Sequence, residues 1–378
     1  MRAVVIGAGA WGLPAAAELA RRGHAVTVVD RFGVANDLSS SPGPTRIWRL
    51  AHPDRIRVRL ALRSVGAMER LGERSGRAVF LRRGLLWRDD ETIDGVAAAL
   101  AAEGVEHTAV AASEVGRFLT GLRPDGRAGI FQPEAGPVLA AASMEAQHAL
   151  LVAAGGSVQV GRTVREIEAE ANGVRIGGDD GLALRADVVV VAPGPGAVEL
   201  LPTLGLDLPL CPRLEQVVHF GAAGTIVTDD LPCWFDGPVG DEPGIYAMAT
   251  PGRGYKVGLD RALRVLDDGD LDRTPDAELL GAASARVARA LVSLDPTPLD
   301  AQVCSWTTSP DNRFVIDTLP GGIVLACGDG GEGFKFSALM GEVLADLAEG
   351  ATADADVATF GLSRFADGYP DSEHILGR

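Results

Sequence analysis

The chain has 378 residues, 47% of them hydrophobic, which is enough for two domains with substantial cores. Its net charge of −16 argues against nucleic acid or an anionic membrane as a partner, because both need a basic surface. No uninterrupted apolar run reaches the roughly 18 residues of a membrane-spanning helix, and no signal-peptide cleavage pattern precedes the first motif, so we expect a cytoplasmic protein.

The first thirty residues predict a strand, a glycine-rich turn, a helix and a second strand. Apolar residues 3–6 lead into Gly7-Ala8-Gly9-Ala10-Trp11-Gly12, a helical run extends to residue 22, and apolar residues 25–29 end at Asp30. This pattern is typical of a dinucleotide-binding βαβ unit: the first glycine permits the tight turn, the second admits the pyrophosphate, and the third lets the helix approach the strand. Asp30 would accept a hydrogen bond from a ribose hydroxyl. The pattern does not distinguish FAD from NAD, and a merely tight structural turn is the alternative.

The segment after Asp30 is predicted to be a loop, because residues 39–44 read Ser-Ser-Ser-Pro-Gly-Pro. Thr45-Arg46-Ile47-Trp48-Arg49 then begins a predicted helix that extends to about residue 71. Arg46 and Arg49 are three residues apart and would lie on one face of this helix. A solvated basic face is the alternative, which Arg55, Arg57 and Arg59 would support equally.

The middle of the chain alternates between two predicted domains. Strands at 78–82 and 85–87 and a helix at 94–103 resemble an insertion from a second domain. A helix at 137–154 precedes strands at 157–160, 163–169 and 173–176. Residues 185–191 read as one continuous apolar strand, of the kind that is buried on both faces of a parallel sheet, so the chain returns there to the nucleotide-binding domain.

Residues 206–299 predict antiparallel strands and then a helix, with Thr274 as N-cap and Pro275 at its first position. Segments 244–249 and 255–260 flank Thr250-Pro251-Gly252-Arg253-Gly254, which is a hairpin signature. Strand alternation places Lys256 and Asp260 on one face. At the end of the chain, 323–327 predicts a strand, 328–333 a glycine loop, and 336–349 a helix that Gly350 ends.

Only two of the 35 basic residues are lysines, Lys256 and Lys335. So strong a preference for arginine indicates that lysine is kept where a compact, titratable ammonium is needed, with two chance surface lysines as the alternative. Lys335 starts the predicted C-terminal helix, where its charge opposes the helix dipole and indicates an anionic partner. The cysteines lack the spacing of a zinc site or a disulfide framework, and each is by default a small buried hydrophobe. They are Cys211, Cys233, Cys304 and Cys327.

Five motifs along the chain resemble those of a known family. They are Gly7 to Gly12 with Asp30; Thr45-Arg46-Ile47-Trp48-Arg49; Gly254-Tyr255-Lys256-Val257-Gly258; Cys304-Ser305-Trp306-Thr307 with Pro310-Asp311 and Phe314-Val315-Ile316-Asp317; and Gly330-Gly331-Glu332-Gly333-Phe334-Lys335-Phe336-Ser337. Almost the whole chain resembles the D-amino-acid-oxidase superfamily of flavoproteins and, within it, the monomeric sarcosine oxidase and N-methyltryptophan oxidase family. The resemblance implies FAD rather than NAD.

The resemblance also implies an α/β fold, α+β overall, in which a Rossmann-like FAD-binding domain accompanies a discontinuous second domain built on an antiparallel sheet. We expect the FAD-binding domain to comprise 1–80, 138–205 and 300–378. The substrate and catalytic domain would comprise 81–137 and 206–299.

Individual roles follow from the matching motifs. Arg49 and Lys335 are implied to hold a substrate carboxylate, Arg46 to lie beside the flavin, and Lys256 to activate oxygen near flavin N5. Cys304 matches the cysteine that forms a thioether to the flavin 8α-methyl, and nearby Arg46 and Lys256 would lower its thiol pKa; a buried structural thiol is the alternative. The expected cofactor-binding residues are Gly7, Ala8, Gly9, Ala10, Trp11, Gly12, Asp30, Arg31, Thr45, Arg46, Val164, Gly194, Cys304, Gly330, Gly331, Gly333 and Lys335.

Several positions depart from the family pattern. Pro42, Asp260 and Glu332 stand where sarcosine oxidases typically carry histidines, and Trp306 replaces a tyrosine beside the substrate. A carboxylate near the amine and an aromatic face favour a cationic or cyclic amine over sarcosine itself. Asp260 fits a solvated strand residue equally well, and Tyr246 matches a catalytic tyrosine only with a one-residue gap.

The predicted activity is FAD-dependent oxidation of a secondary or cyclic amino or imino acid by molecular oxygen, which gives an imine and hydrogen peroxide. No dedicated protein base is visible in the sequence, and no obligate protein partner is expected. One alternative is an FAD-dependent dehydrogenase that passes electrons to a protein partner. Another is an NAD-dependent enzyme with the same βαβ unit, against which the loop at 330–335 argues.

Overall fold

The computed structural model describes residues 1–370, and the last eight residues of the predicted FAD-binding domain lie outside this range. The predicted βαβ unit is present: β1 (Arg2–Ile6), α1 (Gly12–Arg21) and β2 (Ala25–Asp30) follow one another, and β1 pairs in parallel with β2. The elements begin and end within one residue of the predicted positions. Local sequence therefore specified this unit.

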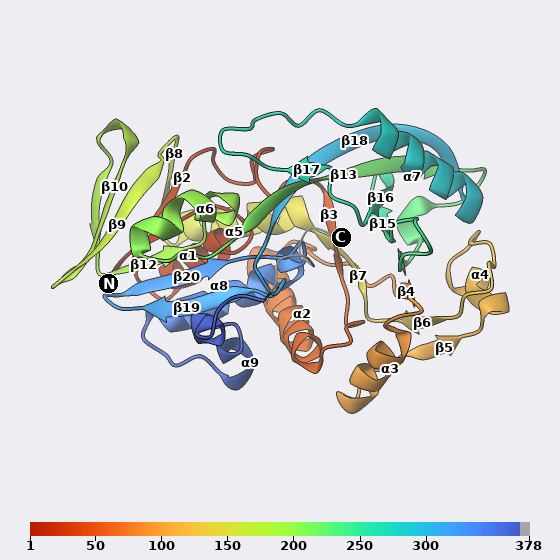
Figure 1. The fold of residues 1–378 in the computed structure, drawn as a ribbon, viewed down its shortest axis with the longest axis horizontal. Coiled ribbons are helices and arrows are strands. Elements are labelled where there is room, and N and C mark those ends of the chain that lie inside the picture. Colours follow the sequence, from red (N-terminus) through yellow and green to blue (C-terminus); the bar gives the residue numbers. More distant parts are fainter. Residues whose placement is uncertain (371–378) are drawn as a thin grey trace.

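The βαβ unit belongs to a six-stranded sheet of order β19-β20-β12-β1-β2-β8, parallel except for β19 (Figure 1). Its further strands are β8 (Ser157–Val160), β12 (Val188–Val191), β19 (Val315–Leu319) and β20 (Ile323–Cys327). Alternation buries both faces of the central strands, because Val5 packs on one side and Val4 on the other. The prediction of a strand buried on both faces is thus confirmed for β12.

Helices cover one face of this sheet and a small sheet covers the other (Figure 1). The helical side carries α1, α2 (Arg55–Ser75), α5 (Ala140–Ala153) and α8 (Ser337–Ala348). The other side carries the antiparallel strands β9 (Val164–Glu170), β10 (Gly173–Gly178) and β11 (Ala183–Ala186), with the short helix α6 (Ala197–Leu200). A last short helix is α9 (Ala355–Ala358).

A nine-stranded sheet forms the other half of the molecule, in the order β17-β13-β16-β15-β14-β4-β6-β5 with β18 paired to β13. The strands are β4 (Leu85–Arg88), β5 (Thr108–Val110), β6 (Gly129–Gln132), β13 (Cys211–Ala222), β14 (Cys233–Asp236), β15 (Ile245–Thr250), β16 (Gly254–Leu259), β17 (Arg264–Val265) and β18 (Leu294–Thr308). All pairs are antiparallel except β4 with β14. The predicted hairpin is confirmed as β15 and β16.

The long pair of β13 and β18 runs side by side along the top of the molecule in Figure 1, and α7 (Ala277–Ala290) lies over the same end of the sheet. Buried Leu279 and Val287 of α7 pack with Val218 and Val257 of the strands. The helices α3 (Ile93–Ala102) and α4 (Val115–Phe118) lie near the opposite edge. Because β18 is one strand, the domain boundary predicted at residue 300 falls inside it.

The helix predicted from residue 45 is wrong at its start. Residues Thr45–Trp48 form β3, which pairs with β7 (Gly136–Leu139) in a two-stranded sheet, and α2 begins only at Arg55. The side chain of Asp54 caps α2 by accepting a hydrogen bond from the Ile56 N–H at 2.9 Å. The β-branched residues Thr45 and Ile47 suit a strand, and the arginines here are therefore not on one helical face. The same pairing corrects the helix predicted at 137–154, which begins at Ala140.

Three further boundaries differ from prediction. Residues 185–191 are divided between β11 and β12 in two sheets, with Asp187 between them accepting a hydrogen bond from the Arg2 N–H at 2.7 Å. The N-cap of α7 is Asp276, whose carboxylate accepts from the Leu279 N–H at 2.8 Å, and not Thr274. The strand predicted at 78–82 is reduced to a single bridge between Phe80 and Val138.

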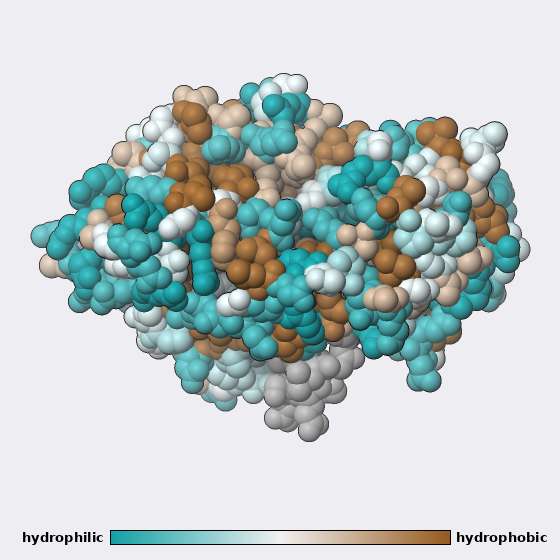
Figure 2. All heavy atoms as spheres, turned by 90° about the horizontal axis from the view of Figure 1, so that it is seen from above, coloured by the Kyte–Doolittle hydropathy of each residue, from teal (hydrophilic) through white to brown (hydrophobic). Residues whose placement is uncertain are grey.

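The exposed surface mixes hydrophilic and apolar side chains. Seen from above, apolar groups lie scattered among hydrophilic ones (Figure 2). The most exposed large apolar side chains, such as Val227, Leu271 and Leu299, come from separate segments. Within residues 1–370, none of the helices has both the length and the apolar character that crossing a bilayer requires.

Candidate active site

A cavity of about 460 Å³ lies between the two large sheets and receives side chains from both. The expected site residues that line it are Gly7, Gly9, Ala10, Trp11, Asp30, Arg46, Arg49, Gly194, Tyr246, Lys256, Asp260, Cys304, Trp306, Gly330, Gly331, Gly333 and Lys335. Residues separated by more than 300 positions in the chain therefore meet in one space. The cavity extends from the acid that ends β2 to the lysine that precedes α8.

The turn after β1 is built for close backbone approach. A Cβ on Gly7 would come within 2.2 Å of the Ala192 carbonyl oxygen, and a Cβ on Gly12 within 2.0 Å of the Gly7 oxygen. Gly7 also has a φ of +103°, which a side chain would strain. Asp30 lines the same end of the cavity and accepts a hydrogen bond from the Ala8 N–H at 2.7 Å. An acid, a glycine turn and the start of α1 in this arrangement fit the adenosine and pyrophosphate of FAD.

Five residues that the sequence assigned to the cofactor do not line the cavity. Ala8 and Gly12 form the interior of the turn, as described above. Arg31 points to the surface, 3.6 Å from Glu199. Thr45 is buried, and its hydroxyl lies 2.8 Å from that of Thr250. Val164 begins β9 in the small sheet.

Lys256 and Arg46 are the basic residues in the middle of the cavity. The ammonium of Lys256 is buried and donates to the Thr45 carbonyl oxygen. Arg46 is held by the carbonyl oxygens of Pro42, at 2.7 Å, and Ser40, at 3.0 Å. Burial, and then the neighbouring charge of Arg46, lower the pKa of Lys256 well below its usual value, whereas Glu215 raises it. The charge on Lys256 therefore depends on the anions around it.

Glu215 is a cavity residue that sequence reasoning missed. It lies on β13 directly opposite Cys304 of β18, and Tyr246 donates a hydrogen bond to its carboxylate. Burial raises the pKa of Glu215 to about 7, although that hydrogen bond lowers it. Its position in β13 gave no sign of a role, because only the pairing of β13 with β18 places it beside the thiol.

Cys304 lies on the wall of the cavity. Arg46 and Lys256 lower its thiol pKa, but burial acts more strongly and the net shift is upward. The expected net lowering of this thiol pKa is therefore wrong for this structure. Cys327, the other thiol on the wall, is buried at the end of β20, and burial raises its pKa to about 12.

Arg49 and Lys335 meet at the far end of the cavity, with the carboxylate of Glu332 between them. Arg49 Nη2 lies 2.8 Å and Lys335 Nζ 3.5 Å from Glu332 Oε1. Arg57 Nε lies 3.5 Å from the other oxygen, Oε2. We define Arg49, Arg57 and Lys335 as the cation cluster. Burial outweighs the attraction of Glu332 and lowers the pKa of Lys335 to about 7.

Aromatic side chains lie beside the cation cluster, and two of them, Trp87 and Phe235, were not predicted from the sequence. Trp87 and Phe235 stack with their ring centroids 3.8 Å apart, and the guanidinium carbon of Arg49 lies 4.5 Å from the Trp87 centroid. Both rings line the cavity. Trp306 also lines the cavity, and among residues 1–370 its indole N–H has no hydrogen-bond partner. This end of the cavity thus combines fixed cations with flat apolar surfaces.

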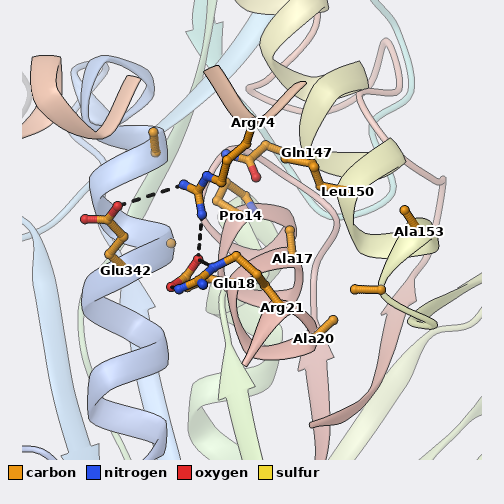
Figure 3. Close-up of a pocket in the computed structure, with 13 residues that line it drawn as sticks. Pro14, Ala17, Glu18, Ala20, Arg21, Arg74, Gln147, Leu150, Ala153 and Glu342 are labelled. Atoms are coloured by element: carbon orange, nitrogen blue, oxygen red, sulfur yellow. Dashed lines mark hydrogen bonds and ion pairs between the residues drawn. The ribbon is translucent and has the colours of Figure 1, made fainter. Parts of the chain in front are cut away.

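A second hollow of about 400 Å³ lies among α1, α2, α5 and α8 (Figure 3). Its charged groups are satisfied by one another: Glu18 accepts hydrogen bonds from Arg21 at 2.6 Å, from Arg22 at 3.0 Å and from Arg74 at 3.0 Å. Arg74 also reaches Glu342 at 4.0 Å. The hollow therefore contains a structural ion cluster that links three helices.

Comparisons with known proteins agree with the fold and with an FAD cofactor. The model of the DAO family, described as FAD dependent oxidoreductase, matches residues 2–347. Monomeric sarcosine oxidase of Bacillus sp. (strain B-0618) is 28% identical, over 96% of this chain and 95% of the relative, and N-methyl-L-tryptophan oxidase of Salmonella dublin is 26% identical, over 96% and 98%. The solved structure of NikD, "an unusual amino acid oxidase essential for nikkomycin biosynthesis", has a TM-score of 0.84 at 27% identity, over 95% of this chain and 96% of that one. The predicted family resemblance and mixed α/β fold class are confirmed.

Proposed function

This chain belongs to the FAD dependent oxidoreductase family, and we propose that it oxidises a carboxylated secondary or cyclic amine with molecular oxygen. The products are an imine and hydrogen peroxide: the substrate loses one hydrogen from carbon and one from nitrogen, and oxygen gains both. The observation that carries the proposal is the cation cluster at the end of a cavity whose other end fits a dinucleotide. FAD, when bound, supplies the acceptor for the hydrogen and electron pair that leave the substrate carbon.

In this proposal the substrate carboxylate binds Arg49 and Lys335. A forked guanidinium and an ammonium give charge-assisted hydrogen bonds that fix both position and orientation. The stacked rings of Trp87 and Phe235 hold the guanidinium of Arg49 in place from one side. Because Lys335 is buried, solvent does not compete for its ammonium.

The amine end of the substrate would face Trp306, Tyr246 and Asp260. Trp306 offers an aromatic face, and Asp260 lies at the end of β16 on the cavity wall. The cations Arg46 and Lys256 disfavour an ammonium nearby, so they promote the neutral amine that oxidation requires. We assign Lys256 to the stabilisation of the charge that develops on oxygen.

We further propose that FAD is attached through Cys304. Both thiols line the cavity, but the charges of Arg46 and Lys256 act on Cys304, whereas the cation that acts on Cys327 is Arg364. Acid-denatured protein should retain the mass of the flavin, and the Cys304→Ser variant should release it. If the denatured wild-type protein has only the mass of its sequence and the supernatant is yellow, the flavin is not covalently attached. Cys304 would then be only a packed thiol.

The second candidate is a dehydrogenase that passes its electrons to a protein partner. The burial of Lys256 favours it, because burial disfavours the positive charge that oxygen reduction needs. The two activities differ in air. An oxidase produces one peroxide per turnover, whereas in a dehydrogenase the yellow colour stays bleached after substrate is added.

The decisive experiment is a peroxide-coupled screen with matched amines. Proline and pyrrolidine share a ring and differ in the carboxylate, and sarcosine and dimethylamine form the corresponding open-chain pair. We expect turnover of a carboxylated member and little turnover of its partner. Equal turnover within each pair would contradict the role of the cation cluster.

A further inference from the structure

Glu332 occupies the place where the proposed function needs an anion from the substrate. Its carboxylate lies within ion-pair distance of all three members of the cation cluster, at 2.8 Å from Arg49 and 3.5 Å from both Lys335 and Arg57. Its side chain is 24% exposed. The protein itself therefore supplies one carboxylate to this end of the cavity.

Three separate segments build this arrangement. Arg49 follows β3, Arg57 lies in the first turn of α2, and Lys335 lies in the turn that precedes α8. Glu332 starts that same turn, three residues before Lys335. Lys335 shares a helical turn with Glu332, whereas Arg49 and Arg57 come from other segments. The cluster therefore exists only in the folded chain.

The cation cluster can form more hydrogen bonds and ion pairs than it makes with Glu332. Within residues 1–370 the Oε2 atom of Glu332 makes no hydrogen bond, and Arg57 Nε makes none either, since 3.5 Å is too long. Lys335 is also beyond a normal ammonium–carboxylate distance. Arg49 Nη2 donates a hydrogen bond to Glu332. Its Nη1 donates to the Ala51 carbonyl oxygen and lies 3.2 Å from His52 Nδ1. Room for further anionic contacts therefore remains.

The charges allow one more anion and not two. Three cations face Glu332 directly, and the attraction of Lys335, His52 and Arg49 keeps the pKa of Glu332 well below its usual value in spite of burial, so it stays ionised. Asp89, which follows β4, and Asp260, which follows β16, add negative charge near Arg49. With one substrate carboxylate bound, the three cations of the cluster face two anions, this carboxylate and Glu332. A second substrate carboxylate would make three anions for three cations, and with Asp89 and Asp260 nearby it would meet an excess of negative charge.

We propose that Glu332 limits the substrate to a single carboxylate by holding one of two anion positions in the cation cluster. This inference deepens the proposed function and rests on it for the identity of the ligand as a substrate. Amines with one carboxylate would bind Arg49 and Lys335 alongside Glu332. Amines with two carboxylates would be rejected by Glu332 rather than by the size of the cavity.

The test compares acetate with malonate, which differ in the number of carboxylates and cannot be oxidised as amines. Binding to the FAD-loaded protein is measured by calorimetry and by the change in flavin absorbance. Glu332→Gln keeps the size of the side chain and an oxygen for Arg49 while it removes the charge. Glu278→Gln, at a side chain that is 81% exposed, is the matched control.

We expect wild-type protein and Glu278→Gln to bind malonate no more tightly than acetate. In Glu332→Gln the affinity for malonate should rise about tenfold relative to acetate, because the second carboxylate no longer meets the negative charge of Glu332. An equal change for both ligands would overturn the inference. Tighter binding of malonate than of acetate by wild-type protein would overturn it without any variant.

The binding test of Glu332 can fail independently of the proposed function. If acetate and malonate bind as expected but no amine produces peroxide or bleaches the flavin, the proposed function fails and the role of Glu332 stands. If carboxylated amines are turned over and the ratio of the two affinities does not change in Glu332→Gln, only the role of Glu332 fails.

Discussion

At the scale of single residues, Arg49 makes the most varied contacts in the cavity. Its guanidinium binds Glu332, the Ala51 carbonyl and His52, and it lies against the Trp87 ring. These contacts fix the direction in which the remaining N–H groups point. A side chain held on several sides loses little conformational entropy when a ligand binds.

The first prediction concerns Arg49→Ala and Lys335→Ala. Either change should weaken turnover of carboxylated amines by about 2 to 4 kcal/mol in kcat/KM, because one charged hydrogen-bond partner is lost, while the flavin stays bound. Glu332 retains two of its three cations in each variant, so the fold should survive. Arg55→Ala, on the surface of the neighbouring α2, is the control. Unchanged kinetics in both variants would refute the assignment.

The second prediction concerns Lys256, which is 2% exposed and packs beside Arg46 and Glu215. Lys256→Met keeps the length of the side chain and removes the ammonium. Reaction with oxygen should slow far more than reaction with the amine, because only the oxygen step develops negative charge next to this position. Stopped-flow measurement separates the two half-reactions. Equal slowing of both would indicate a structural role.

At the scale of elements, the turn between β1 and α1 shows how closely backbone must approach backbone. The third prediction is that Gly12→Ala weakens FAD binding and destabilises the fold by about 2 kcal/mol or more, since its Cβ would lie 2.0 Å from the Gly7 oxygen. Gly196→Ala is the matched control, because its Cβ would meet nothing closer than 3.7 Å and its φ is −65°. Similar losses in the two variants would contradict this account.

The helices on the face of the six-stranded sheet are joined by a buried carboxylate. Although burial alone would raise the pKa of Glu18, hydrogen bonds from Arg21, Arg22 and Arg74 lower it to about 2 (Figure 3). Arg22 continues the network to Asp346 and Glu349 of the C-terminal end of α8. One side chain of α1 thereby ties α1, α2 and α8 together.

The fourth prediction is a loss of acid stability in Glu18→Gln. Because the folded-state pKa lies below the usual 4.5, the ionised carboxylate stabilises the fold above pH 4.5, and this contribution disappears as the pH falls toward 2. It amounts to about 3 kcal/mol of unfolding free energy at neutral pH. Denaturant unfolding at several pH values should show this pH dependence in wild-type protein and in the exposed control Glu278→Gln. A Glu18→Gln variant that retains it would show that other carboxylates cause it.

At the scale of the whole molecule, an acidic chain encloses a cavity rich in cations. The net charge is −16, yet Arg46, Arg49, Arg57, Lys256 and Lys335 all line one space. Neither of the only two lysines is a surface residue, since Lys256 is 2% and Lys335 5% exposed. Basic residues elsewhere largely pair with the many surface carboxylates, as Arg70 does with Glu342.

The fifth prediction follows from a cavity that both large sheets complete. Removal of FAD from Cys304→Ser should lower the thermal midpoint of the whole molecule, because a ligand that binds only the folded state stabilises it by about 4 kcal/mol at one thousand times its Kd. Scanning calorimetry of the loaded and stripped forms should show one transition that shifts as a unit. A shift confined to one of two transitions would show that the sheets unfold independently.

Sequence and structure agree best where neighbouring residues decide the conformation. The βαβ unit, the hairpin of β15 and β16, and the strand β20 follow from strand alternation and glycine turns, which act over a few residues. The errors fall where a distant strand decides. Thr45–Trp48 is a strand because β7, some ninety residues away, pairs with it. No local pattern contains that information.

The sequence alone determined the dinucleotide-binding turn, the unusual status of Lys256 and Lys335, and the resemblance that led to FAD. Only the tertiary structure placed Glu332 between Arg49 and Lys335, and Glu215 opposite Cys304. Arg49 and Glu332 are 283 residues apart in the chain. Backbone sterics and side-chain periodicity act between neighbours and can be read from a sequence, whereas an electrostatic contact depends on distances in space that arise only when the two sheets close around one cavity.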